Sequence, residues 1–273
     1  MSPSPSFEEL LAEGQAVPVE GWDFSWFEGR ATEQRPGWGY ASLLSARLAR
    51  SSSSLDVQTG GGEVLAAALS RASRRPSLPS ATESWPPNVA VAQRVLAPVG
   101  ARVVQVAEDG DLPFRNASFD LVSSRHPTGR RWDELARVLR PGGTYLSQGV
   151  GFGSNRELFE ALMGPQPHEE QPSADRAAAA AEAAGLHVVD LRREATRVEF
   201  FDIAAVVHFL RKVVWTVPDF SVDRYRRPLA ALHEQISRHG SFVSHSQRYL
   251  IEARKRSPVG AGAGVRPRAI VRA

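Results

Sequence analysis

The sequence predicts an α/β fold built on a mostly parallel sheet, and two observations carry this prediction. Five β-type runs alternate with helical runs of about ten residues, the pattern of parallel strands joined by right-handed helical crossovers. The first run, residues 54–57, leads into the glycines Gly60–Gly62 and then into an alanine-rich helix. Glycine lets backbone N–H groups approach a ligand closely at such a turn. A nucleotide-like cofactor is therefore expected there.

The predicted elements follow in order along the chain. The five β-type runs span residues 54–57, 78–82, 101–106, 119–123 and 143–148. The helical runs between and after them span residues 63–73, 89–97, 133–139, 156–163 and 175–184. The last of these ends at Gly185, a favourable C-cap. Two later β-type runs, 186–201 and 241–255, are expected to pair antiparallel at the sheet edge.

Three parts are expected in the chain. Residues 1–50, which are aromatic and helical in pattern, predict an N-terminal helical cap. Residues 51–256 hold the core, with a helical lid inserted at about 202–240, where the pattern is amphipathic. Residues 257–273 are rich in glycine, alanine, proline and arginine, which predicts a disordered basic tail.

The composition excludes several classes of protein. The 273 residues are 42% hydrophobic and 23% charged, as in an ordinary globular protein. Because the chain contains no cysteine, disulfides, thiolate zinc sites and a cysteine nucleophile are excluded, and no metal is expected. No run approaches the ~18 apolar residues of a membrane span, and the N-terminus lacks a signal-peptide core. A cytoplasmic protein without a membrane partner is expected.

The basic charge of the chain lies in its tail. Beyond Glu252 there are six basic residues and no acid, so removing them from the net charge of +3 leaves residues 1–252 at about −3. Enzymes that act on nucleic acids usually carry a basic stripe on the folded body. The charge distribution therefore favours a small-molecule substrate.

Five segments form a recognisable series. They are the glycine turn at 55–62, Glu83 after the second strand, Glu108–Phe114 after the third, Phe119–Val122 opening the fourth, and Ala136–Gly143 before the fifth. Together they resemble the class I S-adenosylmethionine-dependent methyltransferases of the type 11 group, over roughly residues 50–150. The resemblance implies a Rossmann-like fold with a seven-stranded, mostly parallel sheet, an antiparallel last strand, an N-terminal helical cap and a helical lid.

The resemblance also implies the cofactor S-adenosylmethionine and its site. Glu83, 21 residues beyond Gly62, stands where an acid accepts both ribose hydroxyls. Glu108 or Asp109 stands where the family contacts adenine, and Asp56 would orient the methionine ammonium. A solvated surface acid is the alternative for Glu83, Glu108 and Asp109. The residues expected at the cofactor site are Asp56, Gln58, Thr59, Gly60, Gly62, Glu83, Glu108, Asp109 and Ser124.

Gln58 departs from the family pattern. The family has glycine at this position, two residues before Gly60. The Gln58 side chain either crowds the methionine end of the cofactor or turns away from it. The departure leaves open a non-catalytic member of the family.

Other enzyme classes fit the sequence less well. The third glycine of the dehydrogenase pattern G-x-G-x-x-G is absent, and no Tyr-x-x-x-Lys pair follows. The lack of cysteine argues against methylation at pyrimidine carbon. Methylation of exocyclic amines in DNA typically uses an Asn/Asp-Pro-Pro-aromatic turn after the fourth strand, where this chain has Ser123–Pro127.

Polar residues beyond the fourth and fifth strands are the candidates for chemistry on the acceptor. His126 is the candidate general base, because it lies at the carboxyl edge of the sheet and histidine titrates near neutral pH. Gln148 is a candidate for orienting the acceptor, and Arg125 for holding an acidic group of the substrate. A locally hydrogen-bonded histidine and a surface salt bridge are the alternatives for His126 and Arg125.

Aromatic residues flank the core on both sides. In this family the N-terminal segment and the insert before the last strands usually roof the substrate, and aromatic side chains there exclude water and stack on an apolar acceptor. Most of them are expected to be lid core. The candidates for substrate contact are Trp38, Tyr40, His208 and Trp215.

The resemblance implies methyl transfer from S-adenosylmethionine to an O or N atom of a small or medium-sized molecule. Alignment of donor and acceptor supplies ~7–11 kcal/mol in such reactions. Two alternatives stay open. One is methylation of RNA, including ribosomal RNA, with the basic tail as an electrostatic tether. The other is a catalytically inactive protein with a binding or regulatory role.

Overall fold

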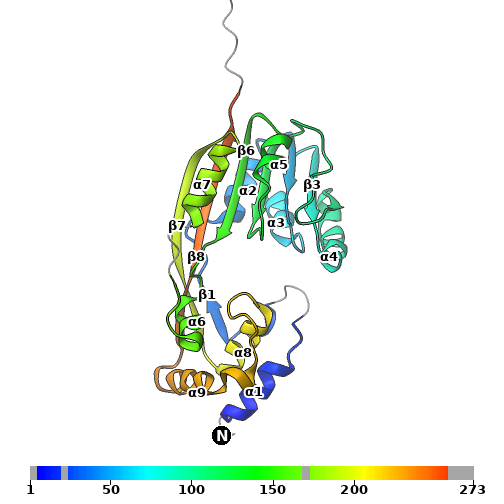
Figure 1. The fold of residues 1–273 in the computed structure, drawn as a ribbon. Coiled ribbons are helices and arrows are strands. Elements are labelled where there is room, and N and C mark those ends of the chain that lie inside the picture. Colours follow the sequence, from blue (N-terminus) through cyan, green and yellow to red (C-terminus); the bar gives the residue numbers. More distant parts are fainter. Residues whose placement is uncertain (1–4, 20–23, 168–172, 258–273) are drawn as a thin grey trace, which may run out of the picture.

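A single sheet of eight strands organises the protein. The computed structural model describes residues 5–19, 24–167 and 173–257, so the predicted tail beyond residue 257 lies outside the described residues. The strand order is β1-β7-β8-β6-β5-β2-β3-β4 (Figure 1). The strands are β1 (Ala31–Glu33), β2 (Ser53–Asp56), β3 (Leu78–Glu83), β4 (Arg102–Gln105), β5 (Phe119–Arg125), β6 (Leu139–Val150), β7 (Leu186–Phe200) and β8 (Phe242–Lys255).

The sheet confirms the predicted Rossmann-like fold of class I methyltransferases. Strands β4, β3, β2, β5 and β6 are parallel neighbours. Strand β8 pairs antiparallel with both β6 and β7, as predicted for the last two β-type runs. The sheet has one strand more than the expected seven, because β1 pairs antiparallel with the outer edge of β7. Strand β1 was not predicted from the sequence, since its three residues show no alternation and it depends on pairing with β7.

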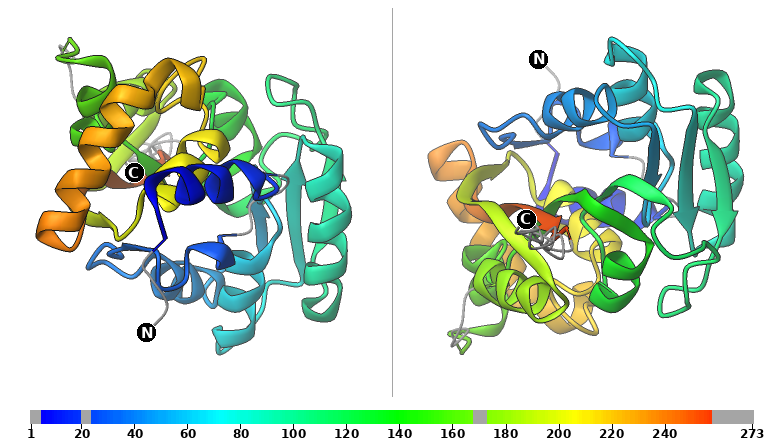
Figure 2. Two further views of the ribbon diagram at one scale, coloured as in Figure 1. Left: turned by 90° about the horizontal axis from the view of Figure 1, so that it is seen from below. Right: turned by 90° about the horizontal axis from the view of Figure 1, so that it is seen from above.

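Helices cover both faces of the parallel part of the sheet (Figure 2). Helices α2, α3 and α4 pack on the face that carries Leu121 and Leu146, and helices α5 and α7 pack on the face that carries Val122 and Tyr145. Neighbouring strand residues point to opposite faces, so each strand contributes to both cores. The bounds are α2 (Tyr40–Leu48), α3 (Glu63–Arg71), α4 (Pro86–Leu96), α5 (Trp132–Val138) and α7 (Ser173–Ala183).

The second half of the molecule lies around the ends of β7 and β8 that extend beyond the parallel strands (Figure 1). It has its own hydrophobic core, to which α1, α6, α8, α9 and the segment around Phe27 contribute. Asp202 caps the N-terminus of α8 by accepting a hydrogen bond from Ala205 N–H. The bounds are α1 (Phe7–Ala16), α6 (Arg156–Met163), α8 (Ile203–Lys212), α9 (Val222–His239) and the short 3₁₀ turn η1 (Ser25–Phe27).

The first fifty residues are divided between the two halves. Helix α1 packs against α8 in the second half, whereas α2 packs against α3 on the sheet. A second 3₁₀ turn, η2 (Ala97–Val99), follows α4. None of the helices in the described segments is both long and apolar enough to cross a membrane.

A glycine permits close packing where β6 approaches the site. Gly149 is the register partner of Tyr249 on β8, and a Cβ atom at Gly149 would overlap the phenol ring of Tyr249. Tyr249 is buried in the core shared with α5 and α7. Because Gly149 has no side chain, the end of β6, including Gln148, can pack closely against β8.

We predict that Gly149→Ala lowers the free energy of unfolding by about 1–3 kcal/mol, because the new methyl group forces the Tyr249 ring or the strand to move. Urea denaturation measures the change. Gly37→Ala is the control, since its Cβ would lie 3.6 Å from the nearest atom, an ordinary contact. Equal effects of the two substitutions would show that Tyr249 does not restrict this position.

Candidate functional site

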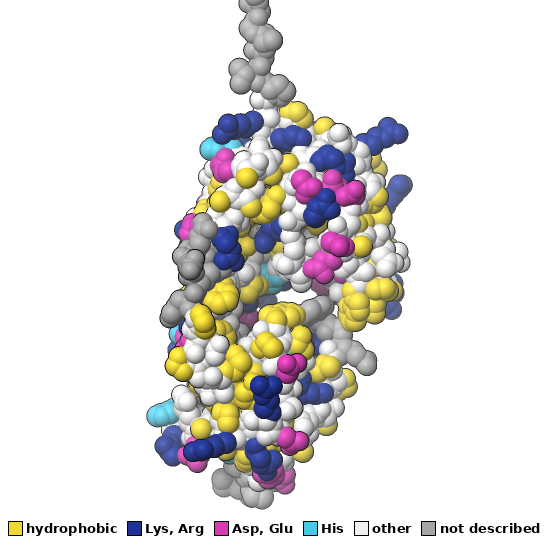
Figure 3. All heavy atoms as spheres, in the orientation of Figure 1, with side chains coloured by type: hydrophobic (Ala, Val, Ile, Leu, Met, Phe, Trp, Pro, Cys, Tyr) yellow, Lys and Arg dark blue, Asp and Glu magenta, His cyan; other side chains and the backbone are white. Residues whose placement is uncertain are grey.

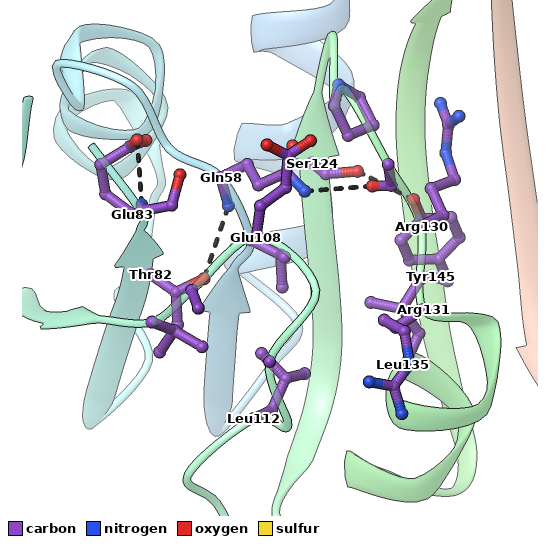
Figure 4. Close-up of a pocket in the computed structure, with 17 residues that line it drawn as sticks. Gln58, Thr82, Glu83, Glu108, Leu112, Ser124, Arg130, Arg131, Leu135 and Tyr145 are labelled. Atoms are coloured by element: carbon purple, nitrogen blue, oxygen red, sulfur yellow. Dashed lines mark hydrogen bonds between the residues drawn. The ribbon is translucent and has the colours of Figure 1, made fainter.

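The predicted cofactor residues converge where β2, β3 and β5 end. A narrow cavity of about 30 Å³ lies there, and a shallower hollow of about 450 Å³ adjoins it. Figure 4 shows Glu83 on one side of the cavity, Ser124 and Arg130 on the other, and Gln58 with Glu108 between them. A cavity of this size has room for a water molecule but not for a nucleoside. Among the described residues, no cluster of three or more metal-ligating side chains is found.

The glycine turn has the backbone geometry that its sequence predicts. Gly60 has φ of +63°, and nothing lies within 4 Å of the Cβ position it leaves empty, so its backbone is open to a ligand. Gly62, with φ of +85°, begins α3, and a Cβ atom there would press on Leu96. The Thr59 hydroxyl between strand and turn is buried and makes no hydrogen bond. The turn thus offers open backbone and an unpaired hydroxyl.

Asp56 ends β2 beneath this turn. Burial raises the pKa of its carboxyl to about 6. The Ser123 hydroxyl, which donates a hydrogen bond at 2.6 Å, opposes this effect on the pKa. The Thr59 hydroxyl opposes it too, although it lies outside normal hydrogen-bond geometry. A buried carboxyl with so few partners is suited to binding a cation, which would restore its charged form.

Glu83, at the end of β3, is the second buried acid. Its Oε2 accepts a hydrogen bond from Gly60 N–H at 2.7 Å. Its Oε1 accepts bonds from the backbone N–H groups of Ser84 and Trp85, at 3.0 and 3.1 Å. These three donors orient the carboxylate toward the glycine turn, next to the cavity that it lines. The position is the one expected of a ribose-binding acid.

Gln58 spans the cavity and ties the glycine turn to the loop after β5. Its Oε1 accepts hydrogen bonds from Thr128 N–H at 2.9 Å and from the Thr128 hydroxyl at 3.1 Å. Its Nε2 donates to Gly129 O at 3.0 Å, and the Thr128 hydroxyl shares its single proton between Gln58 Oε1 and a carboxylate oxygen of Glu108. Gln58 itself has φ of +57°, a left-handed conformation that favours glycine. The family glycine is thus replaced by a side chain that bridges the site.

The remaining expected cofactor residues lie around the same cavity. Ser124 lines it and hydrogen-bonds the Tyr145 hydroxyl at 2.8 Å, while Asp109 lines the adjoining hollow. Arg130 and Tyr145 also line the cavity and were not among the expected residues. An arginine in a basic loop and a tyrosine within a strand carry no sequence signal for a site.

The residues present fit S-adenosylmethionine in their chemistry. Asp56 offers a buried carboxyl for the methionine ammonium, Glu83 an oriented carboxylate for the ribose, and Gly60 an open backbone. The Gln58 side chain is the one element that has to rotate, since it crosses the space between Glu83 and the loop at Thr128. Its bonds are to polar groups at an exposed edge, so rotation exchanges them for bonds to water.

Asp120 lies at the opposite end of β5 from the cavity and stabilises the fold. Its carboxylate accepts hydrogen bonds from the backbone N–H groups of Ser52 and Ser53 and pairs with Arg140. The bonds from Ser52, followed by those from Arg140 and Ser53, outweigh the partial burial and lower the pKa of Asp120 to about 2. This structural role is the one expected from the sequence.

A second polar cluster lies beyond the ends of β5 and β6. The Trp38 indole N–H donates to Gln148 Oε1 at 2.7 Å, and Gln148 Nε2 lies 2.9 Å from His126 Nε2. An indole N–H only donates, so the Gln148 oxygen must face it and the amide nitrogen must donate to His126. His126 Nε2 is therefore the acceptor, and a neutral ring carries its proton on Nδ1. His126 Nδ1 has no hydrogen-bond partner among the described residues.

The surroundings keep the His126 ring neutral. Burial and then the charges of Arg125, Arg248 and Arg130 lower its pKa to about 2. Its backbone has φ of +55°, and its N–H donates to Gln148 O at 2.7 Å. A ring with so low a pKa is a weak general base at neutral pH and a good neutral donor.

The expected substrate-contact residues lie in different places. Tyr40 is buried and donates from its hydroxyl to Ser124 O at 3.0 Å, and Trp38 is half-buried beside Gln148. His208 is 1% exposed inside the second core, with its ring 4.9 Å from Trp26, and burial, then the charges of Lys212 and Arg211, lower its pKa to about 4.

Trp215, by contrast, lies on the surface after α8 and is 61% exposed. In Figure 1 the segment between α8 and α9 faces the parallel sheet, and Figure 3 shows hydrophobic side chains along the hollow between the two halves. Trp38 thus belongs to the polar cluster and Tyr40 lies close to it. His208 is enclosed by other side chains, and Trp215 is accessible to solvent.

We predict that Asp56→Asn stabilises the protein, and more so at about pH 7.5 than at about pH 5. The folded-state pKa of about 6 lies above the ordinary value of 3.8 for an aspartate, so the stability cost of the ionised carboxyl is absent below the unfolded pKa. The cost grows as the pH rises through this interval and is complete above the folded pKa. Thermal unfolding should show a difference of roughly 1 kcal/mol between the two pH values. A pH-independent effect would contradict the raised pKa.

Comparisons with known proteins agree with the fold. A family model described as a methyltransferase domain matches residues 55–147. No curated protein matches the chain. A solved structure of a methyltransferase candidate from Bacillus halodurans C-125 has a TM-score of 0.57 and 18% identity, over 81% of this chain and 100% of that one. The structure of the YcgJ protein of Bacillus subtilis has a TM-score of 0.54 and 17% identity, over 80% of this chain and 97% of that one.

A third similar structure is phosphoethanolamine N-methyltransferase 2 of Haemonchus contortus, in complex with phosphomonomethylethanolamine and S-adenosylhomocysteine. Its TM-score is 0.50 at 17% identity, over 93% of this chain and 61% of that one. At these identities the structural similarities establish the fold, and the family model covers the segments that carry the sequence motifs. Residues 55–147 of this chain therefore match a methyltransferase domain, within a fold like that of the similar structures.

Proposed function

We propose that this protein transfers the methyl group of S-adenosylmethionine to an O or N atom of a small or medium-sized molecule. The observation that supports this most is the meeting of Asp56, Glu83 and the open Gly60 backbone at one edge of the sheet. The similar Haemonchus contortus structure holds a small phosphorylated amine together with S-adenosylhomocysteine. An acceptor of comparable size is proposed for this chain.

The residues of this chain bind and orient the two reactants. When bound, the cofactor supplies an activated methyl group on a sulfonium, so little covalent chemistry is left to the protein. Asp56 holds the methionine ammonium, Glu83 holds the ribose hydroxyls, and Gly60 lets the backbone approach. Holding donor and acceptor in line contributes most of the acceleration.

The Trp38–Gln148–His126 chain orients the acceptor. Each member fixes the next through a hydrogen bond, at 2.7 and 2.9 Å, so the His126 ring cannot rotate freely. The low pKa of His126, about 2 as a result of burial and of three arginines, makes it a donor in this scheme rather than the base expected from its position. An acceptor that is nucleophilic without deprotonation suits such a site.

One observation favours a second candidate function, a non-catalytic binding protein. The Gln58 side chain closes the cofactor cavity with three hydrogen bonds to Thr128 and Gly129. If these bonds persist, the protein cannot hold the cofactor. Methylation of RNA rests on the tail beyond residue 257, which lies outside the described residues.

We expect calorimetric titration of the full chain to show binding of S-adenosylmethionine and S-adenosylhomocysteine and none of NAD. Glu83→Gln should weaken the binding of both by about tenfold or more, because a charged acceptor of the ribose hydroxyls is lost. Asp120→Asn is the matched control: it removes a carboxylate at the opposite end of the strands and should lower stability without changing affinity. Undiminished affinity in Glu83→Gln would exclude the assigned role.

We expect Gln58→Gly to tighten S-adenosylmethionine binding by about tenfold, since it removes the bridging side chain and places glycine in a left-handed conformation. Thr128→Val separates the two effects, because it removes the hydroxyl bond to Gln58 and leaves the turn unchanged. Isothermal titration of both variants gives the affinities. Unchanged or weaker binding by Gln58→Gly would show that Gln58 does not obstruct the site.

A further inference from the structure

Cationic and polar side chains share one face of the sheet beyond the ends of the parallel strands. Arg125 on β5 is the register partner of Gln148 on β6, and Arg248 on β8 is the partner of Val150 on β6. Strand residues two apart share a face, so Gln148 and Val150, with Arg125 and Arg248 beside them, lie on the same side. Trp38 donates its hydrogen bond to Gln148 there.

Arg125 is the unpaired member of this group. Arg248 is 10% exposed at its side chain and forms an ion pair with Glu33. Arg125 makes no hydrogen bond or ion pair with any residue in the described ranges. The residue is exposed to solvent, and partial desolvation by its neighbours lowers the pKa of the guanidinium. An unpaired guanidinium fork matches a planar carboxylate or a phosphate.

The charges that face Arg125 leave its surroundings positive. The Tyr40 hydroxyl and Glu33 favour its charged form, whereas Arg248 and Arg35 oppose it. Glu33 is already paired with Arg248, and the buried Asp56 carboxyl is the second acid that faces Arg125, whose charge opposes the rise in the pKa of Asp56 caused by burial. Three guanidiniums therefore face two carboxylates, and an incoming anion meets a net positive field.

His126 adds a neutral donor at the same place. It follows Arg125 in the chain, and its Nε2 accepts a hydrogen bond from Gln148, so its proton lies on Nδ1. The same arginines that attract an anion keep this ring uncharged. Because Nδ1 has no partner among the described residues, it offers a hydrogen bond next to the unpaired guanidinium.

We propose that the methyl acceptor carries an oxyanion, a carboxylate or a phosphate, and that Arg125 binds it as a forked ion pair with His126 Nδ1–H as an additional donor. The inference rests on the proposed function and names the class of its acceptor. Trp38 is half-buried and Val150 is 42% exposed on the same face, so the body of the acceptor is apolar. Arg125 thereby determines specificity for acidic acceptors.

Titration of the full chain with benzoate, phenyl phosphate and neutral benzamide tests the proposal. We expect at least one of the two anions to bind about tenfold more tightly than benzamide, and the tighter anion identifies the oxyanion. Arg125→Gln should lose this preference, whereas Arg125→Lys should retain part of it, since the charge stays and the fork is lost. Arg238→Gln on α9 is the control, an exposed arginine whose loss should change nothing.

Two further measurements separate this inference from the proposed function. Bound benzoate should shift the ring resonances of His126 in NMR spectra recorded at neutral pH, because Nδ1–H would then donate a hydrogen bond to the anion. Arg125→Gln should keep its S-adenosylmethionine affinity within about twofold, because Arg125 lies outside the cofactor cavity. Failure of the wild type to bind the cofactor would overturn the proposed function alone. Equal binding of benzoate, phenyl phosphate and benzamide, no binding of either anion, or unchanged anion binding by Arg125→Gln would overturn the anionic acceptor.

Discussion

Both halves of the molecule depend on the antiparallel ladder between β7 and β8. It runs from the Leu186–Lys255 pair to the Phe200–Phe242 pair, with one irregularity between Val188 and Asp190. At one end β8 also pairs with β6 and so joins the parallel sheet, and at the other β7 carries β1 and the helices of the second core pack around the strands. Backbone hydrogen bonds thus set the distance between the cofactor edge and the second half, and they place Arg248 beside the end of β6.

The edge of the sheet where β2, β3 and β5 end, which we call the cofactor edge, carries groups that lower the stability of the folded protein. The Asp56 carboxyl is buried with few partners, and burial raises its pKa to about 6. Gln58 adopts a left-handed conformation without being glycine. Such costs are commonly found where a ligand later offsets them, here a cation beside Asp56. Gln58 differs in kind, because its hydrogen bonds to Thr128 and Gly129 stabilise the closed cavity itself.

The polar cluster beyond the ends of β5 and β6, where the acceptor is proposed to bind, has a different electrostatic character. Arginines dominate it, and they keep His126 neutral and leave Arg125 without a partner among the described residues. A base that has to be protonated during the reaction is disfavoured in such a field, while an anionic ligand is favoured. The fold alone does not choose between acceptors, since similar sheets support many activities, so the side chains beyond β5 and β6 decide.

The sequence by itself determined seven of the eight strands, the helices of the core and the edge of the sheet that carries the cofactor residues, because alternation, helical periodicity and glycine turns are local signals. Glu83 and Ser124 lie at the cavity as the motif spacing indicates. Only the tertiary structure decided how distant segments meet. It paired β1 with β7, brought the Gln58 side chain to Thr128 seventy residues away, and surrounded His126 with charges from three separate positions. Such contacts depend on sheet register and on desolvation. Both arise from segments that become neighbours only after folding, so local sequence patterns do not predict them.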